Sequence, residues 1–305
     1  MENCEKGSKS NLRVCVSGGH SGGNDPIYES ETYEMGRLIA KMGFYLDYGF
    51  SNSGVMGAVA KGVLDEWEKN KDKYVENTSP IAGITTQEYY NLYQKDAMLE
   101  KVTDIVLTDT IENRKKKLFD ADIIVFAPGG VGTLDELAYD CVAMQDGFIE
   151  TKPFIVYNIN GFFHHILEYL KEMAKTGFAQ PVPFIVVDNN EELEIAFRLL
   201  KLRYNECGSF KEAYYHARSL AYELPYFIKK KVGDIWVEDL IEEMHNIEQN
   251  GSPEQKNALK DEIEKAYLEK EIARMYDRLA KSGRDTAVIS EKLTKLKTSH
   301  QKKHS

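Results

Sequence analysis

The sequence predicts an α/β protein with a doubly wound parallel sheet, followed by a helical C-terminal extension. Between residues 12 and 200, short apolar runs alternate with amphipathic helical stretches. The runs are rich in β-branched and aromatic residues, as strands buried on both faces are. Beyond residue 205 such runs become scarce, and charged helical patterns continue to the end of the sequence.

Each expected strand is a short apolar run, and helical stretches separate most of them. The strands are Arg13–Ser17, Phe44–Tyr48, Ile81–Thr85, Asp104–Leu107, Ile123–Ala127, Phe154–Tyr157 and Phe184–Val187. The helices are expected at 26–42, 54–70, 110–120, 133–145, 160–176 and 190–200. Asp25-Pro26 is a start signal and Gly43 a stop signal for the first helix. This alternation is typical of a Rossmann-like sheet, whose ligands bind at the carboxyl ends of the strands.

The sequence divides into three regions. Residues 1–11 are polar, and we expect them to be a disordered N-terminus. Residues 12–204 carry the alternation of strands and helices and form one domain, and residues 205–305 form the helical extension. In the extension, Ser252-Pro253-Glu254-Gln255 is a capping box with proline at the first helical position. We expect the extension to pack on the core or on another subunit.

The composition is that of an ordinary soluble protein, because 42% of the 305 residues are hydrophobic and 29% are charged. The formal net charge of −10 argues against a nucleic-acid polymer or an anionic membrane as the main partner. No apolar run approaches the ~18 residues of a membrane span, and the polar N-terminus lacks the apolar core of a signal peptide. The cysteines are scattered without metal-ligand or redox spacing. We therefore expect a cytoplasmic protein.

Residues 70–100 interrupt the alternation. A hydrophilic break at Lys69–Lys73 is followed by Gln87–Glu100, which carries Tyr89, Tyr90 and Tyr93. The plain interpretation is a surface loop with a short helix. The alternative is a lid beside the substrate, because aromatic rings can stack on a base.

The stretch Pro128-Gly129-Gly130-Val131-Gly132-Thr133-Leu134-Asp135-Glu136 is the most informative in the chain. It follows an expected strand and opens a helix, and its glycines let backbone N–H groups approach an anion. The N–H groups and the dipole of a helix start favour a phosphate there. The carboxylate of Glu136, one turn into the helix, then faces whatever group carries the phosphate. A phosphorylated sugar or nucleotide fits such a loop.

Two further glycine-bearing turns follow the first two expected strands. They are Ser17-Gly18-Gly19-His20-Ser21-Gly22-Gly23 and Tyr48-Gly49-Phe50-Ser51-Asn52-Ser53-Gly54-Val55-Met56-Gly57. Neither these turns nor the later stretch matches the dinucleotide fingerprint G-x-G-x-x-G or the Gly-Lys-Ser/Thr ending of a P-loop. A standard dinucleotide or ATP site is therefore not expected.

The glycine stretch that ends at Glu136 resembles the PGGxGTxxE signature of the LOG family, the cytokinin-activating nucleoside 5′-monophosphate phosphoribohydrolases. Asn113-Arg114-Lys115 is similar to the family's Arg-Lys pair on the preceding helix, and the two early loops are similar as well. The resemblance covers residues 12–200. Family members were long labelled lysine decarboxylases, but no histidine here is followed by the lysine usual in a pyridoxal-phosphate decarboxylase site.

Departures from the family pattern surround the presumed base pocket. Phe50 and Ser51 stand where the family usually has further glycines, and Ile111-Glu112 stands where a Met-His pair is usual. Family proteins are also commonly shorter, without the expansion at 70–100 or the helical C-terminus. These changes bear on substrate identity more than on reaction type.

The resemblance implies a hydrolase that splits a purine nucleoside 5′-monophosphate, AMP-like or N6-modified, into free base and ribose 5-phosphate. It makes residues 12–204 a nucleotide-binding catalytic domain. Glu136 would stabilise the oxocarbenium-like ribose or activate water, and Arg114 would hold the substrate or assist the leaving base. Phosphate and nucleotide contacts would come from Lys115, Gly129, Gly130, Gly132 and Thr133, and from Ser17, Gly18, Gly54 and Gly57 at the rim.

The resemblance also bears on cofactors and partners. The chemistry requires no metal and no organic cofactor. Family members typically pair through helices near the active site, so we expect a homo-oligomer, a dimer or higher.

Each functional interpretation has a plainer alternative. Thr133-Leu134-Asp135-Glu136 is also a capping box, in which the glutamate only satisfies the helix start. Arg114 could equally be a solvated arginine paired with Asp109 or Glu112, and His20 a solvated loop residue. For the whole protein, the alternative is a non-catalytic binding protein for a phosphorylated nucleotide or cofactor, with the helical C-terminus mediating protein interaction.

Overall fold

The computed structural model describes residues 12–73, 79–93, 95–150, 152, 154–179, 184–207, 224–232 and 236–282. The N-terminus that the sequence predicts to be disordered, residues 1–11, lies outside these ranges. The chain forms two compact units, Met1–Glu242 and Glu243–Ser305. The first unit holds the sheet.

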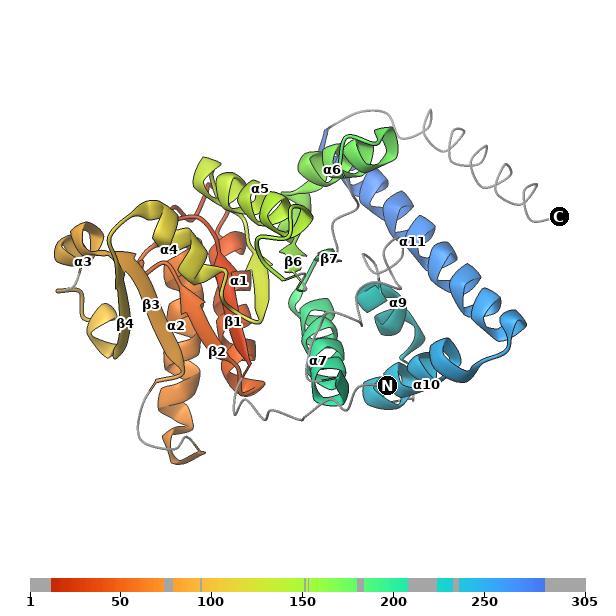
Figure 1. Cartoon of the computed structure of the whole chain (residues 1–305), viewed down its shortest axis with the longest axis horizontal. Coiled ribbons are helices and arrows are strands. Elements are labelled where there is room, and N and C mark those ends of the chain that lie inside the picture. Colours follow the sequence, from red (N-terminus) through yellow and green to blue (C-terminus); the bar gives the residue numbers. More distant parts are fainter. Residues whose placement is uncertain are drawn as a thin grey trace. The chain divides into compact units, whose positions relative to one another are not determined.

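Within the described residues, the first unit is built on a seven-stranded sheet with the order β4-β3-β2-β1-β5-β6-β7 (Figure 1). Its strands are β1 Arg13–Ser17, β2 Tyr45–Tyr48, β3 Ile81–Thr86, β4 Asp104–Thr108, β5 Ile123–Phe126, β6 Phe154–Tyr157 and β7 Phe184–Val187. All the pairings are parallel. The chain winds outward from β1 to β4 and then resumes with β5 on the other side of β1. The predicted doubly wound sheet is therefore confirmed.

Helices connect the strands and continue beyond the sheet. The helices are α1 Ile27–Lys41, α2 Gly54–Lys69, α3 Gln87–Tyr93, α4 Ile111–Leu118, α5 Val131–Gln145, α6 His164–Thr176, α7 Asn190–Cys207, α9 Leu224–Lys231, α10 Val237–Asn250 and α11 Pro253–Lys281. Short 3₁₀ segments lie at Lys71–Lys73, Leu99–Lys101 and Ile159–Gly161. In the 70–100 region, the plain interpretation of a surface segment with a short helix is confirmed by α3, where Tyr89 is exposed.

Some helix boundaries differ from the prediction. α5 begins at Val131 rather than 133, because Gly130 and not Thr133 precedes its first turn. α6 begins at His164 rather than 160, because Asn160 has a left-handed φ of 53° and lies in a 3₁₀ turn instead. α7 continues to Cys207 rather than 200, since the sequence offers no glycine or proline to stop it earlier.

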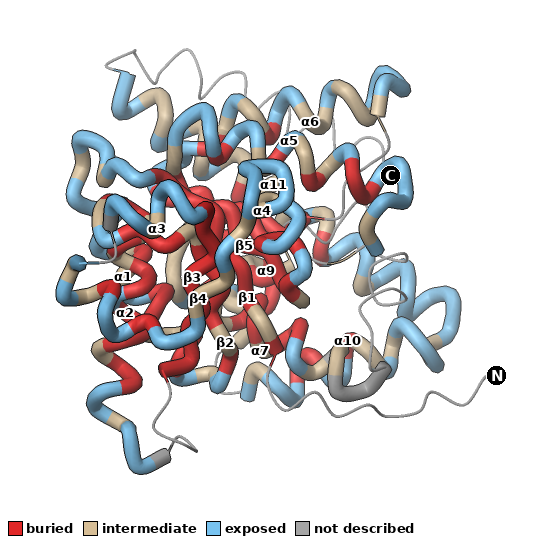
Figure 2. The backbone as a smooth tube through the Cα atoms, turned by 60° about the vertical axis from the view of Figure 1, so that its left-hand side comes forward, coloured by how far each residue is buried: buried red, intermediate tan, exposed pale blue. Residues whose placement is uncertain are grey.

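The sheet separates two hydrophobic cores, because alternate strand residues point to opposite faces. On one face Val14 and Val16 pack with residues of α1, α2 and α7. On the other face Cys15, Ile124 and Phe126 pack with residues of α4, α5 and α6. Figure 2 shows the buried residues concentrated in the strands, with exposed residues on the outer sides of the helices. The first unit thus has helical layers on both sides of its sheet.

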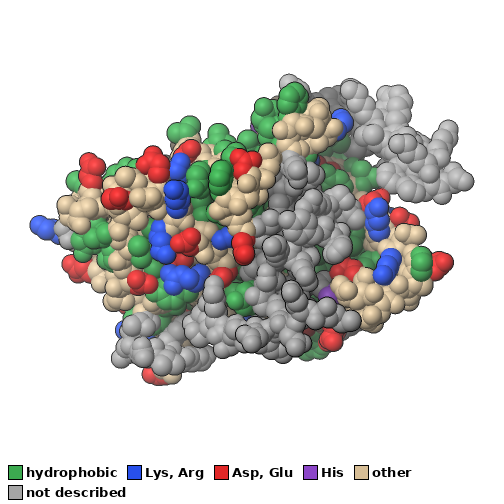
Figure 3. All heavy atoms as spheres, viewed as in Figure 1, with side chains coloured by type: hydrophobic (Ala, Val, Ile, Leu, Met, Phe, Trp, Pro, Cys, Tyr) green, Lys and Arg blue, Asp and Glu red, His purple; other side chains and the backbone are tan. Residues whose placement is uncertain are grey.

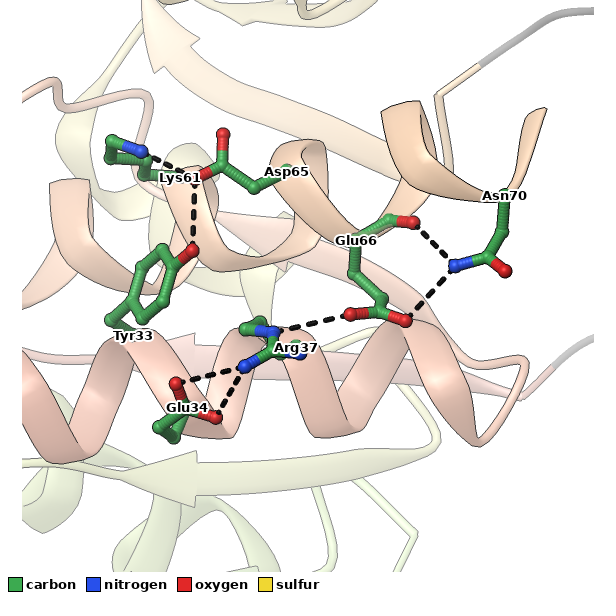
Figure 4. Close-up of polar contacts among 7 residues, drawn as sticks. All are labelled: Tyr33, Glu34, Arg37, Lys61, Asp65, Glu66 and Asn70. Carbon is green, nitrogen blue, oxygen red and sulfur yellow. Dashed lines mark hydrogen bonds and ion pairs between the residues drawn. The ribbon is translucent and has the colours of Figure 1, made fainter.

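α1 and α2 approach each other closely because each has a glycine at the contact. A Cβ on Gly36 or on Gly62 would lie 2.1 Å from a backbone oxygen of the facing helix. The helices are also joined by an ion pair, in which Arg37 Nε donates to Glu66 Oε2 at 3.1 Å (Figure 4). Around this pair lie Tyr33, Glu34, Lys61, Asp65 and Asn70 (Figure 4). The contact holds in place the two helices whose first residues follow the β1 and β2 loops.

The second unit contains α11, which starts as predicted. Ser252 Oγ accepts a hydrogen bond from the backbone N–H of Gln255 at 3.3 Å, and Gln255 Oε1 accepts one from the N–H of Ser252 at 2.8 Å. Pro253 occupies the first helical position, so the capping box is confirmed. Across the described helices of both units, we find none that is long and apolar enough to cross a membrane.

Candidate active site

A cavity of 570 Å³ opens at the carboxyl ends of β1 and β5, where the winding of the sheet changes direction. Its walls come from the loops after β1 and β5, the starts of α1, α2 and α5, and single residues of α4 and the β6–α6 turn. The lining consists of Gly18–Gly23, Tyr28, Val55, Met56, Arg114, Pro128–Thr133, Glu136 and Phe162. The volume suits a small-molecule site, for which ~300–1,000 Å³ is usual. Ligands of doubly wound sheets bind at this place.

The first turn of α5 forms one wall of the cavity. Gly130 precedes the helix, and the first N–H with a helical acceptor is that of Leu134, which donates to Gly130 O at 3.1 Å. The preceding N–H groups, those of Val131, Gly132 and Thr133, have no acceptor within the helix. Because these residues line the cavity, their N–H groups and the helix dipole favour an anion there.

Gly129 is required by its surroundings. A Cβ on this residue would lie 2.1 Å from Thr133 Oγ1 and 2.7 Å from the backbone nitrogen of Gly19. The β1 and β5 loops are also joined by a hydrogen bond from Gly19 N to Pro128 O at 3.0 Å. By contrast, a Cβ on Gly130 or Gly132 would meet nothing within 4 Å. The first glycine therefore lets the two loops touch, whereas the later ones leave open space beside the helix start.

Glu136 does not cap its helix. Because α5 starts at Val131, Thr133 lies inside the first turn, and the capping-box interpretation of this glutamate is wrong. Its Oε2 accepts a hydrogen bond from Ser17 Oγ, and its side chain is 15% exposed. Burial raises the pKa of Glu136, while the Ser17 hydroxyl and the Arg114 guanidinium act to lower it. The structure thus presents a largely buried carboxylate at the cavity wall.

Arg114 reaches the same wall from α4. Its Nε donates to Ile84 O at 3.0 Å, its Nη2 donates to Gly49 O at 3.2 Å, and its Nη1 lies 3.8 Å from Glu136 Oε1. The side chain is only 12% exposed, so the interpretation as a solvated arginine is wrong. Gly49 makes room for it, because a Cβ there would lie 2.2 Å from Nη2. Backbone carbonyls after β2 and in β3 therefore fix the guanidinium beside Glu136.

The structure places the predicted site residues in two groups. The cavity wall brings together Gly18, Arg114, Gly129, Gly130, Gly132, Thr133 and Glu136. Outside the lining lie Ser17, Gly54, Gly57 and Lys115.

The second group has other contacts. Ser17 stands behind Glu136 as its hydrogen-bond donor. Gly54 lets the β1 loop lie close to the start of α2, because a Cβ on Gly54 would lie 2.3 Å from the carbonyl oxygen of His20. Lys115 Nζ binds Asp135 Oδ2 at 2.8 Å and lies 5.2 Å from the centroid of the Tyr139 ring.

An aromatic pair in the lining was missed by sequence reasoning. Tyr28 and Phe162 meet edge to face, with ring centroids 5.8 Å apart and an interplanar angle of 75°. Phe162 follows the left-handed residues Asn160 and Gly161 at the end of β6. The dipeptide Asn-Gly was the available signal, because it marks a tight turn at the edge where ligands bind. The residues of α3 do not line the cavity.

His20 and the β2 loop form a polar cluster on the cavity wall. His20 Nδ1 lies 2.9 Å from Ser51 Oγ, and Ser53 Oγ lies 3.2 Å from the same nitrogen. Phe50 beside them has a φ of 55°, the left-handed conformation that glycine adopts most easily. Its ring is buried against Gly83, where a Cβ would lie 2.3 Å from the ring. This packing holds the bulky Phe50 side chain in place at a left-handed position.

The described residues contain no group of three or more His, Cys, Asp or Glu side chains placed to hold a metal ion. Cys15 and Cys141 are unpaired thiols on β1 and α5. The candidate site therefore consists of a helix start, a carboxylate, a guanidinium, an imidazole and an aromatic pair around one cavity.

Comparison with known proteins gives a matching family model and similar sequences. The family model, described as "Possible lysine decarboxylase", matches residues 56–196. The probable cytokinin riboside 5′-monophosphate phosphoribohydrolase LOGL2 of Oryza sativa subsp. japonica is 27% identical over 170 residues, 55% of this chain and 64% of that protein. The cytokinin riboside 5′-monophosphate phosphoribohydrolase LOG2 of Arabidopsis thaliana is 26% identical over 167 residues, 54% of this chain and 71% of that protein. These matches confirm the resemblance to the LOG family.

Solved structures with a similar fold include carriers of the molybdenum cofactor. The carrier protein from Chlamydomonas reinhardtii matches with a TM-score of 0.45 and 18% identity, over 63% of this chain and 99% of that chain. The molybdenum cofactor binding protein from Rippkaea orientalis matches with a TM-score of 0.43 and 19% identity, over 64% of this chain and 99% of that chain. Likeness at this level carries no argument about what the present chain binds.

Proposed function

We propose that this chain, a relative of the LOG proteins, is a hydrolase that cleaves the N-glycosidic bond of a purine nucleoside 5′-monophosphate. The observation that carries the proposal is the meeting of Arg114 and Glu136, 3.8 Å apart, on the wall of the cavity that the start of α5 also lines. A helix start suited to a phosphate, a carboxylate and a fixed cation in one cavity supply three of the features that the reaction uses. The products are the free base and ribose 5-phosphate.

The phosphate binds at the start of α5 in this proposal. Charge-assisted hydrogen bonds from N–H groups contribute roughly 1.5–3 kcal/mol each, so a few of them anchor the ligand. Gly130 and Gly132 leave the approach open, because a Cβ on either would meet nothing within 4 Å. Lys115 lies outside the cavity lining and is paired with Asp135. It therefore acts on the phosphate only through long-range electrostatic attraction.

Glu136 acts on the anomeric carbon. Cleavage develops positive charge on the ribose, and a carboxylate close to that carbon stabilises it or takes a proton from the attacking water. Ser17 holds Oε2, and Oε1 faces Arg114, so the carboxylate is fixed in orientation. Burial raises its pKa, which makes the carboxylate a stronger base than one in water. The site therefore favours proton transfer as well as charge stabilisation.

A nucleotide panel tests this function. The full-length chain is incubated with AMP, GMP, IMP and an N6-modified AMP, and free base is measured by chromatography. We expect stoichiometric release of base and ribose 5-phosphate from at least one of them. Tight binding of the nucleotides without release of base would instead support the non-catalytic binding protein.

We also propose that a second copy of the chain covers the outer face of α5. Apolar side chains recur there at helical spacing: Leu134 is 47% exposed, Val142 is 54% exposed, and Val131, which also lines the cavity, is 86% exposed. Hydrophobic side chains reach the surface over α5 and α6 in Figure 3. Light scattering on the wild type and on Val142→Glu tests this, and we expect a dimer or higher oligomer that the substitution dissociates. A monomeric wild type would contradict it.

A further inference from the structure

The proposed reaction leaves one requirement unmet by Glu136 and Arg114. When the bond between the anomeric carbon and the base nitrogen breaks, its electron pair stays on the base, which leaves more easily if it takes up a proton. A guanidinium does not give up a proton in proteins. Arg114 is also committed, since Nε and Nη2 donate to backbone carbonyls. The proton must come from another group.

His20 is the imidazole of the cavity lining in the described part of the chain. Imidazole is the side chain best suited to exchange protons near neutral pH. A hydrogen-bonded chain is available to the doubly protonated ring. Nδ1–H can donate to Ser51 Oγ, 2.9 Å away, and the Ser51 hydroxyl donates to Ser53 O at 3.2 Å. Nε2, which lies 3.3 Å from Ser53 Oγ, is then the nitrogen that delivers its proton to a ligand.

Along the carboxyl edge of the sheet, the start of α5, Glu136 and His20 follow the same order as the phosphate, the ribose and the base of a nucleotide. The start of α5 follows β5, Glu136 is held by Ser17 at the end of β1, and the serines that contact His20 follow β2. These strands are neighbours in the order β5-β1-β2. They span about 10 Å, two strand spacings. A phosphate at the first position and the anomeric carbon at the second place the base at the third, beside His20.

We propose that His20 is the general acid that protonates the departing base, an inference that rests on the proposed function. The bond between the anomeric carbon and N9 breaks, its electron pair stays on the purine, and the proton of His20 Nε2 passes to N7. Water adds its oxygen to the anomeric carbon and gives its proton to Glu136. Exchange with solvent then returns a proton to His20 and removes one from Glu136. The sum is one water consumed per base released.

A leaving group that needs no acid isolates this step. GMP and 7-methyl-GMP are compared, because methylation at N7 gives the base the positive charge that the proton would supply. We expect His20→Gln to lower the turnover of GMP by ~10²–10⁴-fold, the usual range for a general acid. Cleavage of 7-methyl-GMP should fall less than threefold. Glu136→Gln should slow both substrates. The same comparison with IMP and 7-methyl-IMP applies if IMP is the better substrate.

His165→Gln is the matched control, because His165 lies on α6 outside the cavity lining and its loss should change neither rate. Equal losses on both substrates in His20→Gln would overturn the proposal, as would an unchanged rate on the unmethylated nucleotide. A wild type that splits the unmethylated nucleotide but not its methylated form would also contradict it. If the wild type releases base from none of the nucleotides, the proposed function itself fails, which is a distinct result.

Discussion

Ser17 donates a hydrogen bond from its hydroxyl to Oε2 of Glu136, and so joins the end of β1 to the first turns of α5. The serine is 4% exposed and lies outside the cavity lining. Ser17 is therefore placed to orient the Glu136 carboxylate and not to contact a phosphate in the cavity.

Ser17→Ala should move the acid limb of the pH–rate profile to higher pH. The Ser17 bond acts to lower the pKa of Glu136, so its loss lets burial raise that pKa further. The carboxylate must be ionised to act, and activity then appears only as the pH rises through the higher value. We expect turnover on the acid limb of the profile to fall ~10-fold, about the effect of one hydrogen bond to a charged group, with a smaller change at higher pH. Ser30→Ala, at an exposed serine of α1, is the control and should leave the profile unchanged.

Gly49→Ala should impair catalysis through Arg114. Its Cβ would lie 2.2 Å from Nη2, so the guanidinium must leave the carbonyl oxygens that hold it. We expect kcat/KM to fall at least ~10-fold with little change in melting temperature. A double-mutant cycle with Arg114→Ala checks the cause, because the alanine at 49 should cost little once the arginine is gone. Fully additive losses would show that Gly49 acts by another route.

Gly129 and Gly132 form a matched pair for testing the anion site. Gly129→Ala places a Cβ 2.1 Å from Thr133 Oγ1, so we expect a loss of stability measurable as a lower melting temperature. Gly132→Ala meets no atom within 4 Å and should keep the fold. In the second variant the methyl group narrows the space beside the helix start, and we expect KM to rise more than kcat falls. A normal KM would place the phosphate elsewhere.

Asp140 should make the stability of the fold depend on pH. Its carboxylate is fully buried, neither oxygen has a hydrogen-bond partner among the described residues, and burial raises its pKa to about 7. The folded state therefore holds the proton more tightly than the unfolded chain. Its contribution to stability is greatest below the unfolded pKa and falls as the pH rises to about 7.

Asp140→Asn removes this titration. We expect the variant to gain stability relative to the wild type as the pH rises from 5 to 8, by at most about 3 kcal/mol, because the effect accrues only up to the folded pKa of about 7. Urea unfolding of both proteins at several pH values measures the difference. A difference that stays constant with pH would show that Asp140 is ionised throughout or does not titrate in this range.

The fold could be predicted from the sequence because its strands are short apolar runs separated by helical patterns. The apolar runs even predicted the bounds of Phe154–Tyr157 and Phe184–Val187 correctly. Periodicity could not place the start of α5, because Thr133 and Glu136 fit a capping box by residue type. The backbone of the folded chain shows instead that Gly130 precedes the helix.

The site was predicted in part for a similar reason. Motifs identified Arg114 and Glu136. Arg114 lies on α4 and Glu136 on α5, and Arg114 Nη1 lies 3.8 Å from Glu136 Oε1. Spacing could not show that Ser17 supports Glu136, that Lys115 pairs with Asp135, or that His20 meets Ser51. These contacts join segments far apart in the sequence, and they depend on the winding order of the sheet.

The central claim is that Glu136 performs the cleavage of a nucleotide held in the cavity at the β1 and β5 ends. The most direct measurement compares AMP turnover and AMP binding in the wild type and in Glu136→Gln, with chromatography for free adenine and calorimetry for binding. We expect the variant to bind AMP within about threefold of the wild type and to release adenine ~10²–10⁴-fold more slowly. Release of adenine at the wild-type rate by Glu136→Gln would contradict the account.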